Sequence, residues 1–305
     1  MSGEPLLVFA YSDVGHACLK ILLEKGENVA GVYTHEDRAG EKLWFPSVAE
    51  LARQHKVPVR TAEDLGEAAE QEFIRGVSPE LILSFYYRNL IPASVLSSAK
   101  RGAFNMHGSF LPKYRGRAPV NWAVLNGETS TGATLHVMVA KADAGDIVDQ
   151  QAVDIGPDDT AAEVQTRVTR AAVAVLARQI ENLKSGTAPR KPQNEAEATV
   201  FGRRRAEDGE IKWTMTAPQI HNLVRAVTHP YPGAFADVRG ERTMIWKTKM
   251  PEYRGTKSGT KPGTVFVRSG RPCVACGDGL ALELVSLQRA GGPELSGTDF
   301  AKRHL

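Results

Sequence analysis

Short apolar runs alternate with segments of helical periodicity through the first half of the chain. The runs lack the regular polar alternation of half-buried strands, so they predict strands that are covered on both faces. The expected strands lie at 6–10, 29–33, 57–60, 81–85, 103–107 and 134–139, and the expected helices at 14–24, 47–54, 120–125 and 160–184. This alternation predicts an α/β domain with a mostly parallel sheet, which we place over residues 1–188.

The hydrophobic pattern changes after a polar, proline-bearing stretch, which indicates a linker over residues 189–203. A helical pattern at 217–227 comes next, and shorter stretches then alternate between apolar and polar residues. These stretches lie at 234–238, 244–247 and 263–268, with glycine-containing turns between them. The pattern predicts a smaller antiparallel β domain over residues 204–305.

Candidate chemistry is concentrated at the end of the predicted strand 103–107. Side chains alternate across a strand, so Asn105 and His107 fall on the same face. Asp143 follows the next predicted strand and supplies a carboxylate. A base, a group that orients it and an oxyanion donor are the usual parts of a site for acyl transfer. We therefore expect Asn105, His107 and Asp143 to form a catalytic group.

These residues belong to a longer motif. Asn-x-His-Gly-Ser-x-Leu-Pro-x-x-Arg-Gly at 105–116, followed by Ala-Asp-Ala-Gly at 142–145, resembles the signature of the folate-dependent formyltransferases. Further similar segments lie at 85–88, 126–129, 201–204, 224–227 and 275–279, so the resemblance covers nearly the whole chain. Within the family it is greatest to the aminoarabinose branch. It implies a Rossmann-like formyltransferase fold with an OB-like C-terminal domain, 10-formyltetrahydrofolate as cosubstrate, and no metal.

The resemblance also implies a role for each catalytic residue. His107 would take a proton from the attacking amine and pass one to the departing folate nitrogen. Asp143 would hold the imidazole ring and favour its protonated form. The side-chain amide of Asn105 would donate to the oxyanion.

Other residues are assigned to binding because they match the family's positions. Those implied for folate are Asn89, Leu90, Ile91, Arg117, Val139, Ala140, Lys141 and Ala142. Asn89 departs from the histidine that is usual in the aminoarabinose branch. Tyr87, Arg203 and Arg204 are candidates for acceptor binding. Packing beside the sheet is the alternative for Tyr87, and a solvated cluster is the alternative for the two arginines.

The expected acceptor is the 4-amine of UDP-4-amino-4-deoxy-L-arabinose, in lipid A modification and polymyxin resistance. Another nucleotide-linked amino sugar, methionyl-tRNA or a folate-binding module without catalysis are the alternatives. Against tRNA, the loop 34–44 is shorter than the basic insertion of that branch. Relatives in the aminoarabinose branch carry a UDP-glucuronic acid decarboxylase domain, which would follow this chain or act as its partner.

Composition narrows these possibilities further. The net charge of +3 gives no reason to expect a nucleic-acid partner. No apolar run approaches the roughly 20 residues that span a bilayer, and no secretory signal begins the chain, so we expect a cytoplasmic protein without a membrane partner. Cys273 and Cys276 lack the second ligand pair of a zinc site. We assign the histidines other than His107, including His136, to packing or solvent.

Overall fold

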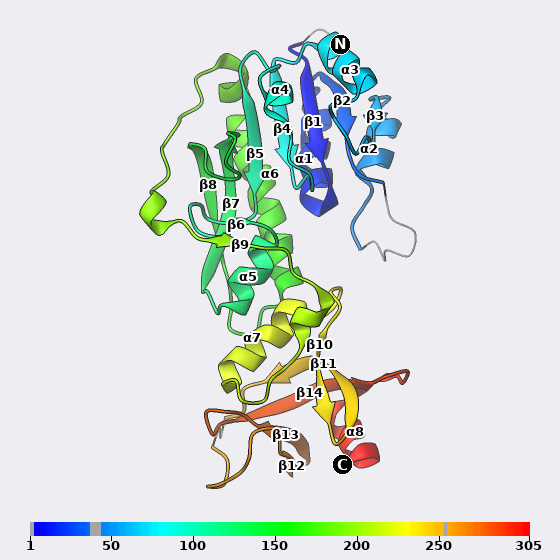
Figure 1. Ribbon diagram of the computed structural model, residues 1–305, viewed down its shortest axis with the longest axis vertical. Helices are drawn as coiled ribbons and strands as arrows, with labels where there is room; N and C mark the ends of the chain where they lie inside the picture. The colour runs from blue at the N-terminus through cyan, green and yellow to red at the C-terminus, as the bar shows by residue number, and fades with distance from the viewer. Residues whose placement is uncertain (1–2, 37–43, 253–254) are drawn as a thin grey trace. The chain divides into compact units, whose positions relative to one another are not determined.

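The computed structural model describes residues 3–36, 44–252 and 255–305. Its contacts divide the chain into two compact units (Figure 1). The first unit contains residues 1–117, 131–153 and 166–201, and the second contains 118–130, 154–165 and 202–305. The chain therefore enters the second unit twice before its C-terminal part begins.

A seven-stranded sheet forms the centre of the first unit. Its strands are β1 (Leu6–Ala10), β2 (Val29–Tyr33), β3 (Val59–Arg60), β4 (Leu81–Phe85), β5 (Ala103–His107), β7 (Ser130–Val137) and β8 (Ile147–Asp154), in the order β3-β2-β1-β4-β5-β7-β8. The pairs from β3 to β5 are parallel, whereas β5 and β7 are antiparallel. The expected mostly parallel sheet is confirmed.

Helices complete the first unit. They are α1 (Ser12–Glu24), α2 (Val48–Gln54), α3 (Ala68–Val77), α4 (Ala93–Leu96) and α6 (Ala161–Ser185), whose first turns belong to the second unit. Every residue of β1 and β4 is buried, as the continuous apolar runs predict. Leu7, Phe9 and Ile82 from these strands pack in one apolar cluster with Ile74 of α3.

The order of the strands determines where a ligand can approach. Chain order reverses between β1 and β4, because β2 and β3 lie on one side of β1 while β4 and β5 lie on the other. Open α/β sheets bind their ligands outside the carboxyl ends of the strands at such a point. Tyr11, Tyr86 and Gly108 follow β1, β4 and β5 at this edge.

The segment 189–201, which we call the strap, lies along the first unit. Its β9 (Val200–Phe201) pairs in parallel with β6 (Arg115–Gly116). The backbones of Lys191 and Ile147 exchange two hydrogen bonds, at 2.8 and 2.9 Å. The strap also contains the short 3₁₀ helix η1 (Glu195–Glu197). It thus contacts both the loop after β5 and the start of β8.

The second unit combines helices with an antiparallel sheet. Its elements are α5 (Pro119–Leu125), η2 (Ala206–Gly209), α7 (Ala217–Val227), β10 (Ala234–Val238), β11 (Glu241–Lys249), β12 (Val265–Arg268), β13 (Arg271–Ala275), β14 (Ala281–Arg289), β15 (Glu294–Ser296) and α8 (Gly297–His304). The sheet has the order β10-β11-β14-β13-β12, and β15 pairs with β14. The predicted antiparallel C-terminal β domain is confirmed.

Local signals explain where α7 begins and how it packs. Thr216 and Gln219 form a capping box, in which each side chain accepts the other residue's backbone N–H. The helix packs against α5, where the Asn121 side-chain amide donates to the carbonyl of Ala226.

Two further observations concern the cysteines and the helices of the described residues. Cys18, Cys273 and Cys276 are buried free thiols. Within the described ranges, no helix is both long and apolar enough to cross a bilayer.

Candidate active site

The carboxyl end of β5 brings the three predicted catalytic residues together. Asn105 and His107 lie on one face of β5, and Asp143 lies in the turn that follows β7. The Asp143 Oδ1 atom is 3.4 Å from Asn105 Nδ2 and 3.5 Å from His107 Nδ1. A carboxylate, an imidazole and an amide from two segments therefore meet at one point.

The environment of His107 determines which ring nitrogen can act as a base. His107 is 6% exposed, and its Nε2 lies 2.7 Å from the carbonyl oxygen of Tyr114. A carbonyl can only accept a hydrogen bond, so Nε2 carries a proton. In the neutral ring Nδ1 is then the basic nitrogen, and this is the atom that faces Asp143.

Asp143 remains a carboxylate in this environment. Its side chain is 12% exposed, and its Oδ2 accepts the Gly116 backbone N–H at 2.9 Å. Burial alone would raise the pKa of Asp143. The charge of His107, together with the interactions of His136 and the Gly116 amide, instead holds this pKa well below its usual range. The site therefore keeps a fixed negative charge beside the His107 ring.

The amide of Asn105 is oriented by its neighbours. Its Nδ2 lies 3.1 Å from His136 Nε2 and 3.4 Å from Asp143 Oδ1. The second contact is longer than an ordinary N–H···O hydrogen bond. One hydrogen of the amide is therefore engaged by His136, and the other is held only loosely.

Sequence reasoning assigned His136 to packing or solvent, but the structure brings it into this group. His136 is 2% exposed and stands opposite Asn105 in the β5–β7 pairing. Its Nδ1 donates to the carbonyl of Val137 at 2.9 Å, and its Nε2 lies 3.1 Å from Asn105 Nδ2 and 3.4 Å from Asp143 Oδ1. The antiparallel register of β5 and β7 would have revealed this contact, but the sequence did not predict that register.

The segments predicted to bind folate meet around Arg117. Leu90 is 81% exposed on the loop after β4, whereas Ile91 is buried. Arg117 Nη2 donates to the carbonyl of Arg88 at the start of that loop, at 3.1 Å. On the other side, the neighbouring Gly116 amide donates to Asp143. The two loops are therefore tied to adjacent residues of one short segment.

The remaining predicted folate residues line the turn that carries Asp143. Val139, Ala140, Lys141 and Ala142 are all exposed, and Asn89 is exposed on the opposite loop. Lys141 Nζ forms an ion pair with Glu195 of the strap at 2.8 Å. Their part in folate binding stays a prediction.

Two tyrosines, Tyr86 and Tyr87, directly follow β4 at the edge of the sheet where its parallel strands end. Tyr87 stacks on His35, with ring centroids 4.3 Å apart, and its buried hydroxyl has no hydrogen-bond partner among the described residues. Tyr86 has a left-handed backbone with φ of 59°. Its hydroxyl lies so close to Gly108 that a Cβ there would be 1.8 Å away. The glycine after His107 therefore makes room for Tyr86.

The two predicted acceptor-binding arginines belong to the second unit. The Arg204 guanidinium lies 4.8 Å from the centre of the Trp122 ring and donates to the Asp208 carbonyl at 3.0 Å. Arg203 is exposed. Their part in acceptor binding stays a prediction.

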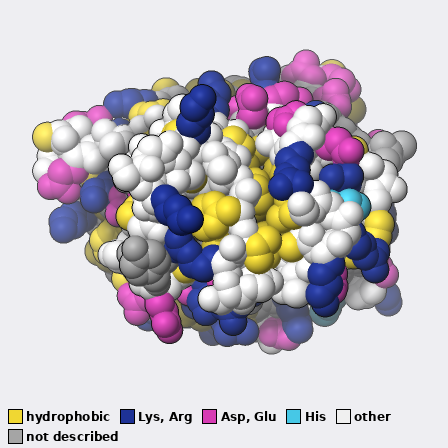
Figure 2. Space-filling model, turned by 90° about the horizontal axis from the view of Figure 1, so that it is seen from below, with side chains coloured by type: hydrophobic (Ala, Val, Ile, Leu, Met, Phe, Trp, Pro, Cys, Tyr) yellow, Lys and Arg dark blue, Asp and Glu magenta, His cyan; other side chains and the backbone are white. Residues whose placement is uncertain are grey.

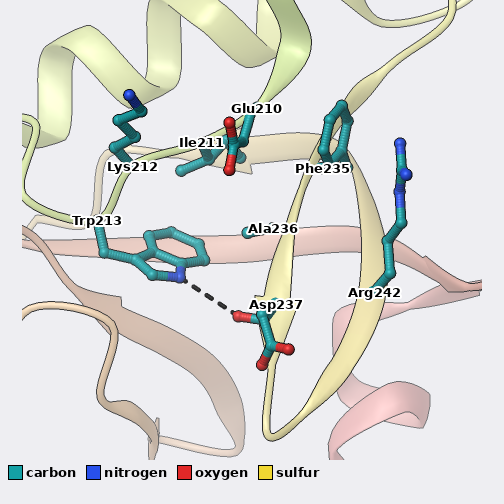
Figure 3. A pocket seen from close by; sticks show the side chains of 8 residues that line it. All are labelled: Glu210, Ile211, Lys212, Trp213, Phe235, Ala236, Asp237 and Arg242. Atoms are coloured by element: carbon teal, nitrogen blue, oxygen red, sulfur yellow. Dashed lines mark hydrogen bonds between the residues drawn. The ribbon is translucent and has the colours of Figure 1, made fainter. Parts of the chain in front are cut away.

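The second unit also has a cavity of about 460 Å³ (Figure 3). The residues that line it are Glu210, Ile211, Lys212, Trp213, Phe235, Ala236, Asp237 and Arg242. The Trp213 indole donates to the Asp237 carbonyl at 3.4 Å, and the Arg242 guanidinium covers the Phe235 ring at 3.9 Å. None of the three predicted catalytic residues lines this cavity, so its size does not identify it as the active site.

A metal centre was not expected. Across residues 3–36, 44–252 and 255–305, no three His, Cys, Asp or Glu side chains are grouped so that they could hold a metal ion.

Comparison with protein families identifies the class of the chain. Residues 6–180 match the formyl transferase family, and residues 204–305 match the formyl transferase C-terminal domain. The chain therefore belongs to the formyl transferase family. The expectation of a formyl-transferring enzyme is confirmed at this level.

Several solved structures share the fold. A sugar 3N-formyltransferase, WlaRD, solved with dTDP and 5-N-formyl-THF, has 17% sequence identity and a TM-score of 0.73, covering 96% of this chain and 100% of its own. An N-formyltransferase from Helicobacter canadensis, solved with folinic acid and dTDP-3-aminofucose, has 21% sequence identity and a TM-score of 0.70. The match covers 93% of this chain and 98% of the other. A 4-N-formyltransferase from Francisella tularensis has 21% sequence identity and a TM-score of 0.63, and the match covers 78% of this chain and 95% of the other.

Proposed function

We propose that the protein transfers a formyl group from 10-formyltetrahydrofolate to the amine of a nucleotide-linked amino sugar. The observation that carries this proposal is the meeting of Asn105, His107 and Asp143 at the carboxyl end of β5. The similar structures that contain a formylated folate together with dTDP or a dTDP-amino sugar support it. The acceptor that we propose is UDP-4-amino-4-deoxy-L-arabinose, and the reaction would serve lipid A modification and polymyxin resistance.

The geometry suggests how the protons move. The neutral amine of the acceptor attacks the formyl carbon, and His107 Nδ1 takes the proton that the amine releases. Asp143 stabilises the charged ring, and the Asn105 hydrogen that is held only loosely by Asp143 Oδ1 turns to the oxyanion as it forms. The bond from the formyl carbon to the folate nitrogen then breaks, and His107 returns the proton to that nitrogen.

In this proposal, folate binds beside this group. The turn at 139–142 and the loop at 89–91 are both exposed except for Ile91, and both are tied to the segment that holds Arg117. Exposed backbone groups on two loops can hydrogen-bond a pterin ring, and Arg117 supplies a positive charge for an anionic tail.

The charge of the chain favours a small acceptor over tRNA. The net charge is only +3, and on the one face that Figure 2 shows, the Lys and Arg side chains stand in separate groups around apolar surface. Binding of tRNA depends strongly on concentrated positive charge. The loop 34–44, which also distinguishes the two acceptors, lies mostly outside the described residues.

The proposal implies a supply of acceptor by another enzyme. A UDP-glucuronic acid decarboxylase, as a following domain or a separate partner, fits the acceptor that we propose.

The test of the proposed function is an acceptor panel. Release of tetrahydrofolate would be followed with UDP-4-amino-4-deoxy-L-arabinose, a dTDP-linked 3-amino sugar, a dTDP-linked 4-amino sugar and initiator methionyl-tRNA. We expect turnover of the UDP-sugar at the highest kcat/KM. Preference for a dTDP-sugar would keep the reaction and change the acceptor, whereas turnover of methionyl-tRNA alone would refute the proposal.

Replacement of Asn105 by alanine tests the oxyanion role. We expect kcat to fall by about 10²- to 10³-fold with little change in KM, because the donor acts on charge that develops in the transition state. Steady-state kinetics with the preferred acceptor measures both constants. A rise in KM at constant kcat would mean that Asn105 contributes only to binding.

A further inference from the structure

Gln193 connects the strap to the turn that carries Asp143. Its Nε2 donates to the backbone carbonyls of Asp143, at 2.8 Å, and Gly145, at 2.7 Å. Its Oε1 accepts from Nε and Nη2 of Arg115, at 3.1 and 2.7 Å. The Gln193 amide thus donates two hydrogen bonds to the turn that carries Asp143, which we call the catalytic turn, and its oxygen accepts two from Arg115 in the loop that follows β5.

Arg115 determines which way the Gln193 amide faces. Arg115 is 1% exposed, so its buried guanidinium must be matched by acceptors. Glu195 accepts from Nη1 and Nη2 at 3.1 and 2.6 Å, and Gln193 Oε1 supplies the remaining acceptor. A flipped amide would direct N–H groups at a cation and its oxygen at two carbonyls. The amide therefore has only one satisfactory orientation.

The catalytic turn needs such support. Asp143 has φ of 54°, which is an unfavourable backbone conformation for a residue with a side chain. Gly145 is pressed against the end of β7, where an added Cβ would lie 1.9 Å from the carbonyl oxygen of Val137. A strained turn persists when its surroundings determine it. Gln193 provides two hydrogen bonds to this turn from outside it.

We propose that Gln193 is a positioning residue for formyl transfer. By holding the carbonyls of Asp143 and Gly145, it keeps the Asp143 carboxylate beside His107. The kinetic consequence rests on the proposed function, whereas the effect on the position of Asp143 does not. Gln193 lies 50 residues after Asp143, in a segment whose composition indicated only a linker.

Two substitutions separate this role from simple support of Arg115. Gln193→Glu keeps an acceptor for Arg115 but directs a carboxylate oxygen, in place of N–H donors, at the two carbonyls. Gln193→Ala removes both functions. Asn194→Ala is the matched control, because Asn194 is the exposed neighbour in the strap and its side chain hydrogen-bonds to Glu197 and Ala196 of η1.

We expect Gln193→Glu to lower kcat by about 10- to 100-fold, since small displacements of a catalytic group have effects of this size. KM should change little. The melting temperature should fall because the carbonyls of Asp143 and Gly145 lose their donors, while circular dichroism should show that the variant is still folded. Gln193→Ala should lower kcat as well, and Asn194→Ala should have no effect on it. If Gln193 served only to neutralise Arg115, Gln193→Glu would be as active as the wild type, and the proposal would be overturned.

A second measurement does not require catalysis. The backbone N–H of Gly116 donates to Asp143 Oδ2 at 2.9 Å, so its hydrogen exchange reports whether the carboxylate is in place. By NMR, we expect exchange at Gly116 to become at least about 10-fold faster in both Gln193 variants, with Leu135 of β7 as the unchanged reference. Unchanged exchange at Gly116 would refute the positioning role. If the wild type transfers no formyl group, the proposed function fails while this exchange still decides the role of Gln193.

Discussion

Alanine at position 107 is expected to lower kcat by about 10²- to 10⁴-fold, which is the usual contribution of a positioned acid–base group. His107 carries the basic nitrogen that faces Asp143, and alanine removes it without changing the strand that holds it. Single-turnover formyl transfer measures the chemical step directly. The loss of the Nε2 hydrogen bond leaves the buried Tyr114 carbonyl unpaired, so we also expect a destabilisation of about 1–3 kcal/mol.

A control separates this role from the general effect of replacing a histidine. His55→Ala changes an exposed histidine at the end of α2 and should be fully active. Retention of the wild-type rate in His107→Ala would remove His107 from proton transfer.

Replacement of Asp143 by asparagine is expected to lower kcat by about 10²- to 10⁴-fold, as when a carboxylate that orients a catalytic histidine is replaced. The new amide can donate a hydrogen bond to His107 Nδ1 and so occupy the lone pair needed for catalysis. The interaction that stabilises the charged ring is lost at the same time. Kinetics of formyl transfer, with circular dichroism as the check of folding, measures the effect. An active Asp143→Asn enzyme would mean that the carboxylate does not act through His107.

The lowered pKa of Asp143 predicts how this variant depends on pH. A carboxyl group whose pKa is lower in the folded protein stabilises the fold above its unfolded pKa of about 3.9. That stabilisation is lost as the pH falls through the folded pKa. The difference in unfolding free energy between wild type and Asp143→Asn should therefore decrease as the pH falls below about 4. A difference that grows as the pH falls would contradict the low pKa.

The sequence predicted the elements whose side chains are buried on a regular pattern. The runs at β1, β2 and β4 are apolar throughout or nearly so, and β5 alternates between apolar residues and the polar Asn105 and His107. The structure has these four strands at the predicted bounds. The helix α3 was not predicted, because Glu70 and Ile74 are its only buried residues and a narrow apolar face gives weak periodicity. The strand β8 was missed for a related reason, since polar residues occupy its middle.

Only some residues of the predicted site could be found from the sequence. Asn105 and His107 could be paired from strand alternation alone, and Asp143 was added because it follows the next predicted strand. His136 and Gln193 could not be found in this way, because their roles depend on an antiparallel register and on a contact across 50 residues. Alternation predicts which residues share a face, but it does not predict which segment packs beside them.

The strap has a consequence for where the catalytic domain ends. Arg115 is matched by groups 78 and 80 residues later in the chain, and the backbone N–H of Tyr114 is accepted by Thr199, 85 residues later. Contacts between residues so distant in sequence form only when the later segment is present. During synthesis, the loops of the active site therefore acquire their final support after residue 201 has left the ribosome. A fragment cut at residue 188 would retain all three predicted catalytic residues but lack the segment that secures them.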